Sequence, residues 1–133
     1  MRAVIDTNVL VSALINPKGT PARLVNEIRT LTLTPVVSQA VLEEYGEVLR
    51  RPQFNFPLTI VNELLDDMVA LALHIRPDAV LPASLPDPDD APFIAVARTA
   101  ACPIVTGNAR HFPAKYGVEI LSPAECLQRL FTA

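Results

Sequence analysis

Carboxylate and amide side chains occur at several separate places in the sequence where they could contribute to one oxygen-rich site. The first is Asp6, which directly follows the apolar residues 3–5, a pattern typical of a short buried strand. A carboxylate at the end of a buried strand loses hydration, so it is stable there only if other groups compensate for that loss. Asp6 therefore either caps a helix that begins at Thr7 or Asn8, or joins other polar groups in a functional site.

The second acid lies on a helix that we expect to follow Ser38, its N-cap, and to run to Arg50. At about 100° per residue, its apolar side chains form one buried arc. These side chains are Val41, Leu42, Tyr45, Val48 and Leu49. Glu43 and Glu47 then face solvent, whereas Glu44 lies at the border between core and solvent. Glu44 is thus either a solvated residue on the flank of the helix or an acid that points into a cleft.

Three further acids, Asp87, Asp89 and Asp90, precede a helix that we expect to begin at residue 89 or 90 and to end near residue 101. One of Asp89 and Asp90 is expected to be the N-cap, because acids are favoured at the positive end of a helix. Asp90 is in line with the apolar stripe of that helix, so it is the acid that we expect to face the strand ends. Asp87 and Asp89 are candidates for the rim of the site or for coordination through water.

Asn108 follows residues 103–106, another short run that predicts a strand. Its amide could supply a neutral oxygen or a hydrogen-bond donor, although Gly-Asn is also a frequent turn pair. Several carboxylates at one site repel each other unless a cation neutralises them, and oxygen ligands without His or Cys suit Mg²⁺ or Mn²⁺ rather than Zn²⁺. Such a site can activate water and stabilise the charge of a phosphodiester transition state.

Strand-like and helix-like segments alternate along the chain, which predicts an α/β fold with a central, mainly parallel sheet and helices on both faces. The predicted strands are residues 3–5, 31–37, 74–76, 103–106 and 118–121. The predicted helices are residues 9–15, 21–29, 39–50, 59–74, 90–101 and 123–131. Thr20 and Ser122 are the expected N-caps before Pro21 and Pro123, the second of them in a capping box. In such sheets ligands bind at the carboxyl ends of the strands, where Asp6 and Asn108 are expected.

Composition limits the classes of function. The 133 residues make about one domain, residues 1–133, and half of them are hydrophobic, which excludes a disordered tail. Eleven basic and fourteen acidic residues leave a formal charge of −3, which excludes nucleic-acid binding by bulk cationic attraction. We expect no membrane span and no signal peptide. Cys102 and Cys126 are not spaced as a close metal-ligand pair and make no disulfide framework, so a cytoplasmic protein is expected.

Four segments together resemble the motifs of PIN domains, in the order in which that family has them. They are residues 3–14 (AVIDTNVLVSAL), 37–52 (VSQAVLEEYGEVLRRP), 87–97 (DPDDAPFIAVA) and 104–113 (IVTGNARHFP). The resemblance spans essentially the whole chain and is closest to the bacterial toxin-like branch. It implies a three-layer α/β/α nuclease with an Mg²⁺- or Mn²⁺-dependent acidic site that acts on RNA. Many relatives are toxins of VapBC-type toxin–antitoxin pairs, which implies a cognate antitoxin and a homodimer.

The resemblance also assigns roles to individual residues. It implies that Asp6, Glu44 and Asp90 are the catalytic, metal-binding acids, and that Asn108 stands where the family often has a fourth acid. The residues that resemble the supporting polar positions of the family are Thr7, Asn8, Ser12 and Thr106. With one acid fewer than many relatives, the site could have a weaker second metal or a lower activity.

Basic residues near the predicted site are candidates for binding RNA phosphates. Arg50 and Arg51 stand at the end of a predicted helix, where the helix dipole alone also favours cations, and Arg110 follows the Asn108 loop. A surface-loop role is preferred for His111 over general acid–base work.

Two other classes of protein compete with the nuclease. A receiver-like Mg²⁺-binding signalling domain needs a Lys after a late strand, but the chain has only Lys18 and Lys115, neither of them in such a place. A dehalogenase-type phosphatase would need Asp where Asn8 stands. The last alternative is an RNA- or protein-binding module that keeps the fold but has lost catalysis, for which only Asn108 argues.

Overall fold

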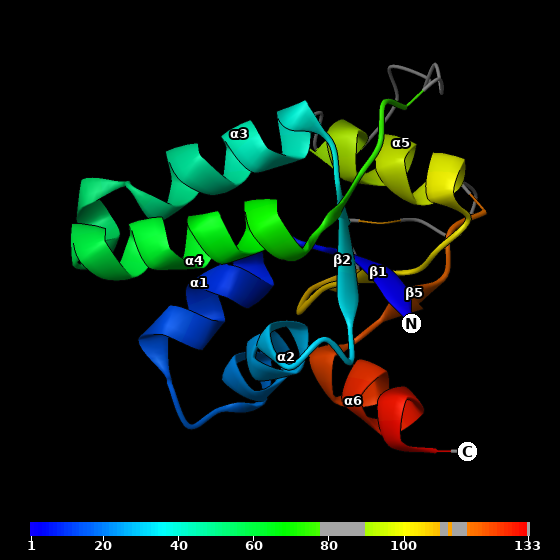
Figure 1. Cartoon of the computed structure of the whole chain (residues 1–133), viewed down its shortest axis with the longest axis horizontal. Helices are drawn as coiled ribbons and strands as arrows, with labels where there is room; N and C mark the ends of the chain where they lie inside the picture. The colour runs from blue at the N-terminus through cyan, green and yellow to red at the C-terminus, as the bar shows by residue number, and fades with distance from the viewer. Residues whose placement is uncertain (78–89, 110–111, 113–116, 133) are drawn as a thin grey trace.

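The structure is a computed structural model that describes residues 1–77, 90–109, 112 and 117–132. Within these residues five short strands form one sheet: β1 Arg2–Ile5, β2 Thr34–Val37, β3 Leu73–His74, β4 Ile104–Val105 and β5 Ile120–Leu121. The α-helices described are α1 Thr7–Ile15, α2 Thr20–Arg29, α3 Gln39–Leu49, α4 Leu58–Leu71, α5 Ala91–Ala100 and α6 Pro123–Phe131, with a 3-10 turn at Pro52–Phe54 (Figure 1).

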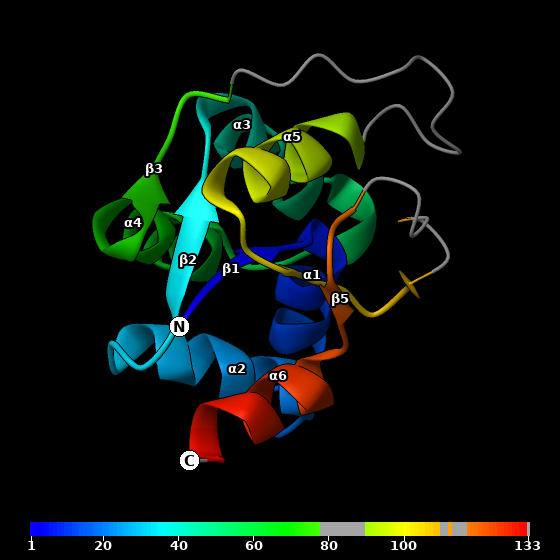
Figure 2. The same cartoon turned by 90° about the vertical axis from the view of Figure 1, so that its right-hand side faces the viewer.

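The sheet is parallel throughout, with the strand order β3-β2-β1-β4-β5. The chain first moves outward from β1 to β3 and then crosses back through α5 to β4, on the other side of β1. Because crossovers between parallel strands are right-handed, this reversal puts α5 on the opposite face of the sheet from α1, α3 and α4, as Figures 1 and 2 show. The predicted three-layer α/β/α fold is confirmed.

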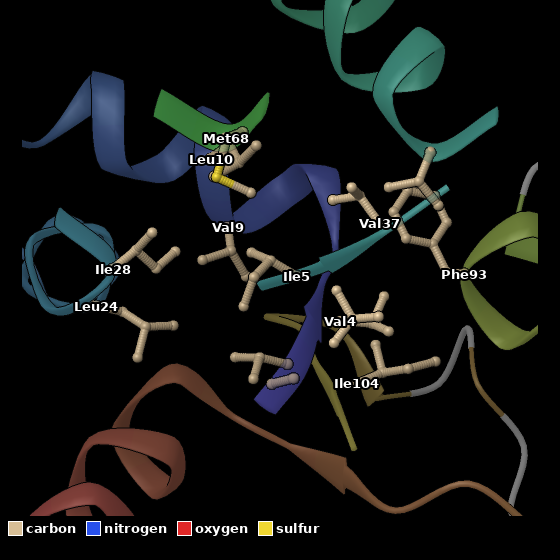
Figure 3. Close-up of a cluster of buried hydrophobic side chains, with 14 of the residues drawn as sticks. Val4, Ile5, Val9, Leu10, Leu24, Ile28, Val37, Met68, Phe93 and Ile104 are labelled. Atoms are coloured by element: carbon tan, nitrogen blue, oxygen red, sulfur yellow. The ribbon is translucent and has the colours of Figure 1, made fainter. Parts of the chain in front are cut away.

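The central strand β1 lies inside the core, with Val4 and Ile5 fully buried. Helical residues pack around it, among them Val9, Leu10 and Phe93 (Figure 3). A strand covered on both faces needs apolar residues at successive positions, which explains why residues 3–5 do not alternate with polar ones. No helix within the described part of the chain is both long and apolar enough to cross a membrane.

Two of the three predicted N-caps outside the acidic segments are confirmed. The Ser38 hydroxyl accepts a hydrogen bond from the Val41 amide at 3.2 Å and begins α3. Ser122 and Glu125 exchange the two hydrogen bonds of a capping box at the start of α6. The prediction for Thr20 is wrong, since the N-cap of α2 is Gly19 and Thr20 is already helical. A Pro at the second helical position is as compatible with the helix as one at the first, because neither needs its amide hydrogen.

Several predicted element boundaries are also wrong, including those of the strands predicted at residues 103–106 and 118–121, which are Ile104–Val105 and Ile120–Leu121. The second strand covers Thr34–Val37 rather than residues 31–37, because residues 30–33 end α2 in a Schellman motif. In this motif the Thr32 amide donates to the Glu27 carbonyl at 2.9 Å and the Leu31 amide to the Ile28 carbonyl at 3.1 Å. The strand was predicted too long because Leu and Thr alternate at residues 31–34, a pattern that is also typical of strands.

The helix predicted over residues 59–74 ends at Leu71, and His74 belongs to β3 rather than to the end of a helix. Apolar residues continue without a break from the end of α4 into β3, so their spacing does not show where the helix ends. β3 pairs with β2 through Leu73 and His74, so the short strand predicted at residues 74–76 is shifted by one residue at its start.

Leu31 generates a prediction about stability. It is 72% exposed and has a backbone φ of 67°, a left-handed conformation that disfavours any residue with a Cβ atom. Replacing it by glycine should raise the free energy of unfolding by about 1 kcal/mol, because glycine is the preferred residue at this position of a Schellman motif. Urea denaturation of Leu31→Gly measures the change.

Leu31→Ala is the matched control, since it removes the same exposed side chain but keeps the Cβ atom. We expect it to lack this gain in stability. Equal stabilities for the glycine and alanine variants would contradict the argument from backbone strain.

Candidate functional site

The site is built where β1 and β4 end side by side. The Asp6 amide donates to the Val105 carbonyl at 2.9 Å, which continues the pairing of the two strands to their last residues. The strand order reverses between these two strands, since the helices after β1 lead to one edge of the sheet and β4 leads to the other. In open α/β sheets this switch point is the place where ligands bind.

Asp6 and Thr106 meet at this switch point. They are 7% and 2% exposed, and the Thr106 hydroxyl donates a hydrogen bond to Asp6 Oδ2 at 2.7 Å. A buried carboxylate needs such donors to replace its lost hydration. Asp6 occupies the N-cap position of α1, but within the described residues its side chain makes no capping bond. The capping interpretation of Asp6 is therefore not what the structure has.

Asn8 determines the direction of the Thr106 hydroxyl. Asn8 Oδ1 accepts from the Gly107 amide at 3.2 Å, which turns its Nδ2 toward Thr106 Oγ1 at 3.3 Å. The Asn108 amide also donates to Thr106 Oγ1, at 3.0 Å. Because both acceptor positions of the hydroxyl are used, its one hydrogen is directed to Asp6. Asn8 and Thr106 thus lie in one hydrogen-bond network with Asp6, and their supporting role in a catalytic site stays a prediction.

Glu44 reaches the same edge from α3. It is half-buried, whereas Glu43 and Glu47 are exposed, as the helical geometry predicted. The hydroxyl of Thr7, the residue after Asp6, donates to Glu44 Oε2. Thr7 therefore contacts one of the predicted acids, and its supporting role stays a prediction. This hydrogen bond links the end of β1 to the helix that carries Glu44.

Tyr45 is a site residue that the sequence placed only in the buried arc of its helix. Its side chain is fully buried and its hydroxyl donates to the backbone carbonyl of Ile5. Burial raises the pKa of Tyr45 well above 10, and the nearby carboxylates of Asp6 and Glu44 raise it further. The negative charges of both acids thus act on one hydroxyl group. A signal existed in the sequence, because a buried tyrosine hydroxyl needs a hydrogen-bond partner.

Asp90 lies at the start of α5, on the other face of the sheet (Figure 2). It is 6% exposed and precedes α5 at the N-cap position, where its side chain makes no capping bond within the described residues. One turn further along α5, Phe93 packs against Tyr45 with ring centroids 6.1 Å apart. The start of α5 is thereby held near α3. The expectation that Asp90 faces inward agrees with its burial.

The chemistry of the donor set fits a hard divalent cation, because Asp6 and Asp90 are carboxylates removed from water and Glu44 is a half-buried carboxylate. Among residues 1–77, 90–109, 112 and 117–132, however, no three Asp, Glu, His or Cys side chains are grouped closely enough to hold a metal ion as they stand. Asp87 and Asp89 lie outside the described residues. The metal ligands Asp6, Glu44 and Asp90 therefore stay a prediction.

The other predicted site residues lie further out. The Ser12 side chain is exposed on α1. Arg50 donates to Asn62 Oδ1 at 3.2 Å, and Arg51 forms an ion pair with Glu47 at 3.1 Å. Exposed contacts of this kind contribute little to stability, so both guanidinium groups can exchange partners. Arg110, like His111, lies outside the described residues.

Comparison with known proteins assigns the family. Residues 2–110 match the model of the PIN domain. An uncharacterized protein of Methanocaldococcus jannaschii, MJ1680, is 32% identical over 111 residues, which are 81% of this chain and 71% of the relative. No solved structure is significantly similar. The chain belongs to the PIN-domain family. PIN domains are generally nucleases, and they typically use divalent metal ions.

The Thr106 hydroxyl generates a prediction. Thr106→Val keeps the shape of the side chain but removes the donor to Asp6 Oδ2 and the acceptor for the Asn8 side chain and the Asn108 backbone amide. We expect the free energy of unfolding at neutral pH to fall by about 1–3 kcal/mol, because buried polar groups lose their partners. Urea denaturation measures this fall.

Thr106→Ser is the control, because it keeps the hydroxyl. It should lose clearly less stability than the valine variant. If valine is tolerated as well as serine, the hydroxyl does not stabilise the buried carboxylate.

Proposed function

We propose that this protein is a metal-dependent ribonuclease that hydrolyses RNA phosphodiester bonds. The observation that carries the proposal is that two acids, Asp6 and Glu44, accept hydrogen bonds from threonine hydroxyls at the end of β1, the switch point of a PIN-family sheet. Each acid accepts a hydrogen bond from a threonine next to it, Thr106 for Asp6 and Thr7 for Glu44. Oriented carboxylates without His or Cys among them favour a phosphodiesterase that uses Mg²⁺ or Mn²⁺.

In this proposal Asp6, Glu44 and Asp90 hold the cation, which when bound stabilises the negative charge that develops on the phosphodiester oxygens. Thr106 and Thr7 keep the carboxylate oxygens of Asp6 and Glu44 in fixed directions, which lowers the reorganisation needed during the reaction. The side-chain amide of Asn108, whose backbone N–H donates to Thr106, is the group that we propose to assist a substrate oxygen or a water molecule. Arg50, Arg51 and Arg110 are candidates for binding the RNA backbone.

The biological setting that we propose is the toxin of a type II toxin–antitoxin pair in the cytoplasm. The motif resemblance of residues 37–52 to the toxin-like branch supports this setting. The partners would be RNA, a second copy of the chain and a cognate antitoxin that blocks the site. Light scattering of the purified protein decides whether it is a dimer, and a small DNA-binding protein encoded by the adjacent gene is expected if the setting is correct.

The central prediction concerns Asp6. Purified protein supplied with Mn²⁺ should degrade single-stranded RNA, and Asp6→Asn should reduce the rate by more than about 100-fold, because losing a metal ligand exceeds the usual effect of losing a residue that supports one. Circular dichroism and urea denaturation check that the variant is folded. Cleavage by the variant as fast as by the parent would mean that the activity lies elsewhere or comes from a contaminant.

A pair of variants on α3 tests the role of Glu44. Glu44→Gln should lower the cleavage rate by about 10-fold or more, whereas Glu43→Gln should leave it unchanged, because Glu43 faces solvent on the same helix. The two substitutions remove one negative charge each from neighbouring residues, so a general electrostatic effect on RNA binding would appear in both. Equal rates for the two variants would remove Glu44 from the site.

A second candidate function is a binding module that keeps the fold without catalysis. Asn108 favours it, because the family often has an acid in that place. Calorimetric titration that detects no Mn²⁺ binding would support the module over the nuclease. The receiver-like alternative is set aside, because the sheet order β3-β2-β1-β4-β5 differs from the 2-1-3-4-5 order of that class of fold.

A further inference from the structure

Tyr45 contacts the element of each predicted acid. It is the residue next to Glu44 on α3, and its hydroxyl donates to the carbonyl of Ile5, the residue before Asp6. Its ring packs on Phe93, three residues after Asp90 and therefore about one turn along α5. One fully buried side chain thus joins β1, α3 and α5, the three elements that the predicted acids follow, belong to or precede.

The hydrogen bond of Tyr45 differs in kind from those of the two threonines. Thr7 and Thr106 donate to oxygens of Glu44 and Asp6 themselves, so their bonds use lone pairs that a cation would also use. Tyr45 donates instead to a backbone carbonyl. It can therefore hold the end of β1 against α3 without occupying any carboxylate oxygen, and this contact need not change when a cation binds.

Such a contact is needed because the negative charges of the acids favour moving them apart. Two carboxylates near one hydroxyl repel each other in the absence of a cation, and this repulsion favours separation of α3 from the end of β1. The Tyr45 hydroxyl, which donates to the Ile5 carbonyl, holds α3 to the end of β1 against this repulsion. The ring contact with Phe93 adds the third element.

We propose that Tyr45 is a positioning residue that sets the spacing of Asp6, Glu44 and Asp90 for a divalent cation. The proposal rests on the proposed function, and it adds to it a residue that does not itself touch cation or substrate. It follows that removing the hydroxyl alone should weaken binding of the cation while the fold and the binding of RNA are retained.

Tyr45→Phe is the test, because it keeps the ring and its packing on Phe93. Calorimetric titration of the full chain with Mn²⁺ alone should give an affinity about 10-fold lower than that of the parent, the usual effect of losing a residue that supports metal ligands. With RNA as substrate, kcat should fall by a similar factor while KM stays close to that of the parent.

Ser38→Ala is the matched control. It removes the N-cap hydroxyl of the same helix, and it is expected to destabilise α3 without touching the contacts of Tyr45. Weaker Mn²⁺ binding in Tyr45→Phe but not in Ser38→Ala supports the proposal. Parent-like Mn²⁺ binding by Tyr45→Phe, or equal losses in both variants, overturns it. Should Tyr45→Phe fail to fold, Phe93→Leu replaces it, with the same expected loss of affinity and the same control.

Failure of the proposed function has a different signature. If the parent itself binds no Mn²⁺, the metal-dependent nuclease is wrong, and the positioning role is then decided by ¹³C NMR of the side-chain carboxyl groups without metal. Shifts of the Asp6 and Glu44 signals in Tyr45→Phe, with those of the distant Asp67 and Glu119 unchanged, support the positioning role. Unchanged Asp6 and Glu44 signals overturn it.

Discussion

The removal of carboxylates from water at the ends of parallel strands is the constraint on which this structure depends. Asp6 and Asp90 are both almost fully buried, and a buried charge is stable only with donors or opposite charge around it. For Asp6 the surrounding loops supply a donor, since the Thr106 hydroxyl is held in direction by Asn8 and by the Asn108 amide. The hydrogen-bond network at this edge of the sheet is therefore a consequence of burying Asp6.

Helices on both faces of the sheet contribute residues to this region. Reversal of the strand order at β1 puts α3 on one face of the sheet and α5 on the other, and both helices have residues at the carboxyl end of β1. Glu44 approaches from the border of the buried arc of α3, and Asp90 precedes α5. Tyr45 and Phe93 fill the space between the two helices with apolar contact, so polar groups meet at the edge and hydrophobic groups directly below it.

Membership of the PIN-domain family gives this edge its chemical context. The matched region, residues 2–110, includes the strand ends, α3 and the start of α5. Asn108 departs from the pattern of that family, and its backbone amide nevertheless takes part in the network around Asp6 through Thr106. A position that lacks the fourth carboxylate therefore still contributes to the order of the site, through its main chain.

The sequence by itself determined the class of fold, the elements at the centre and the acids to consider. These features are local patterns, which depend only on residues close together in the sequence. They include the apolar run at residues 3–5, the serine caps of α3 and α6, and the border position of Glu44. At residues 30–33 and 72–74 the sequence misplaced the boundary between a helix and the following strand, because packing and the closing hydrogen bonds of a helix decide it. Only the tertiary structure decided that the Tyr45 hydroxyl donates to the Ile5 carbonyl and that the Thr106 hydroxyl donates to Asp6. These partners are 40 and 100 residues apart in the sequence, and only the packing of α3 and the pairing of β4 with β1 bring them together.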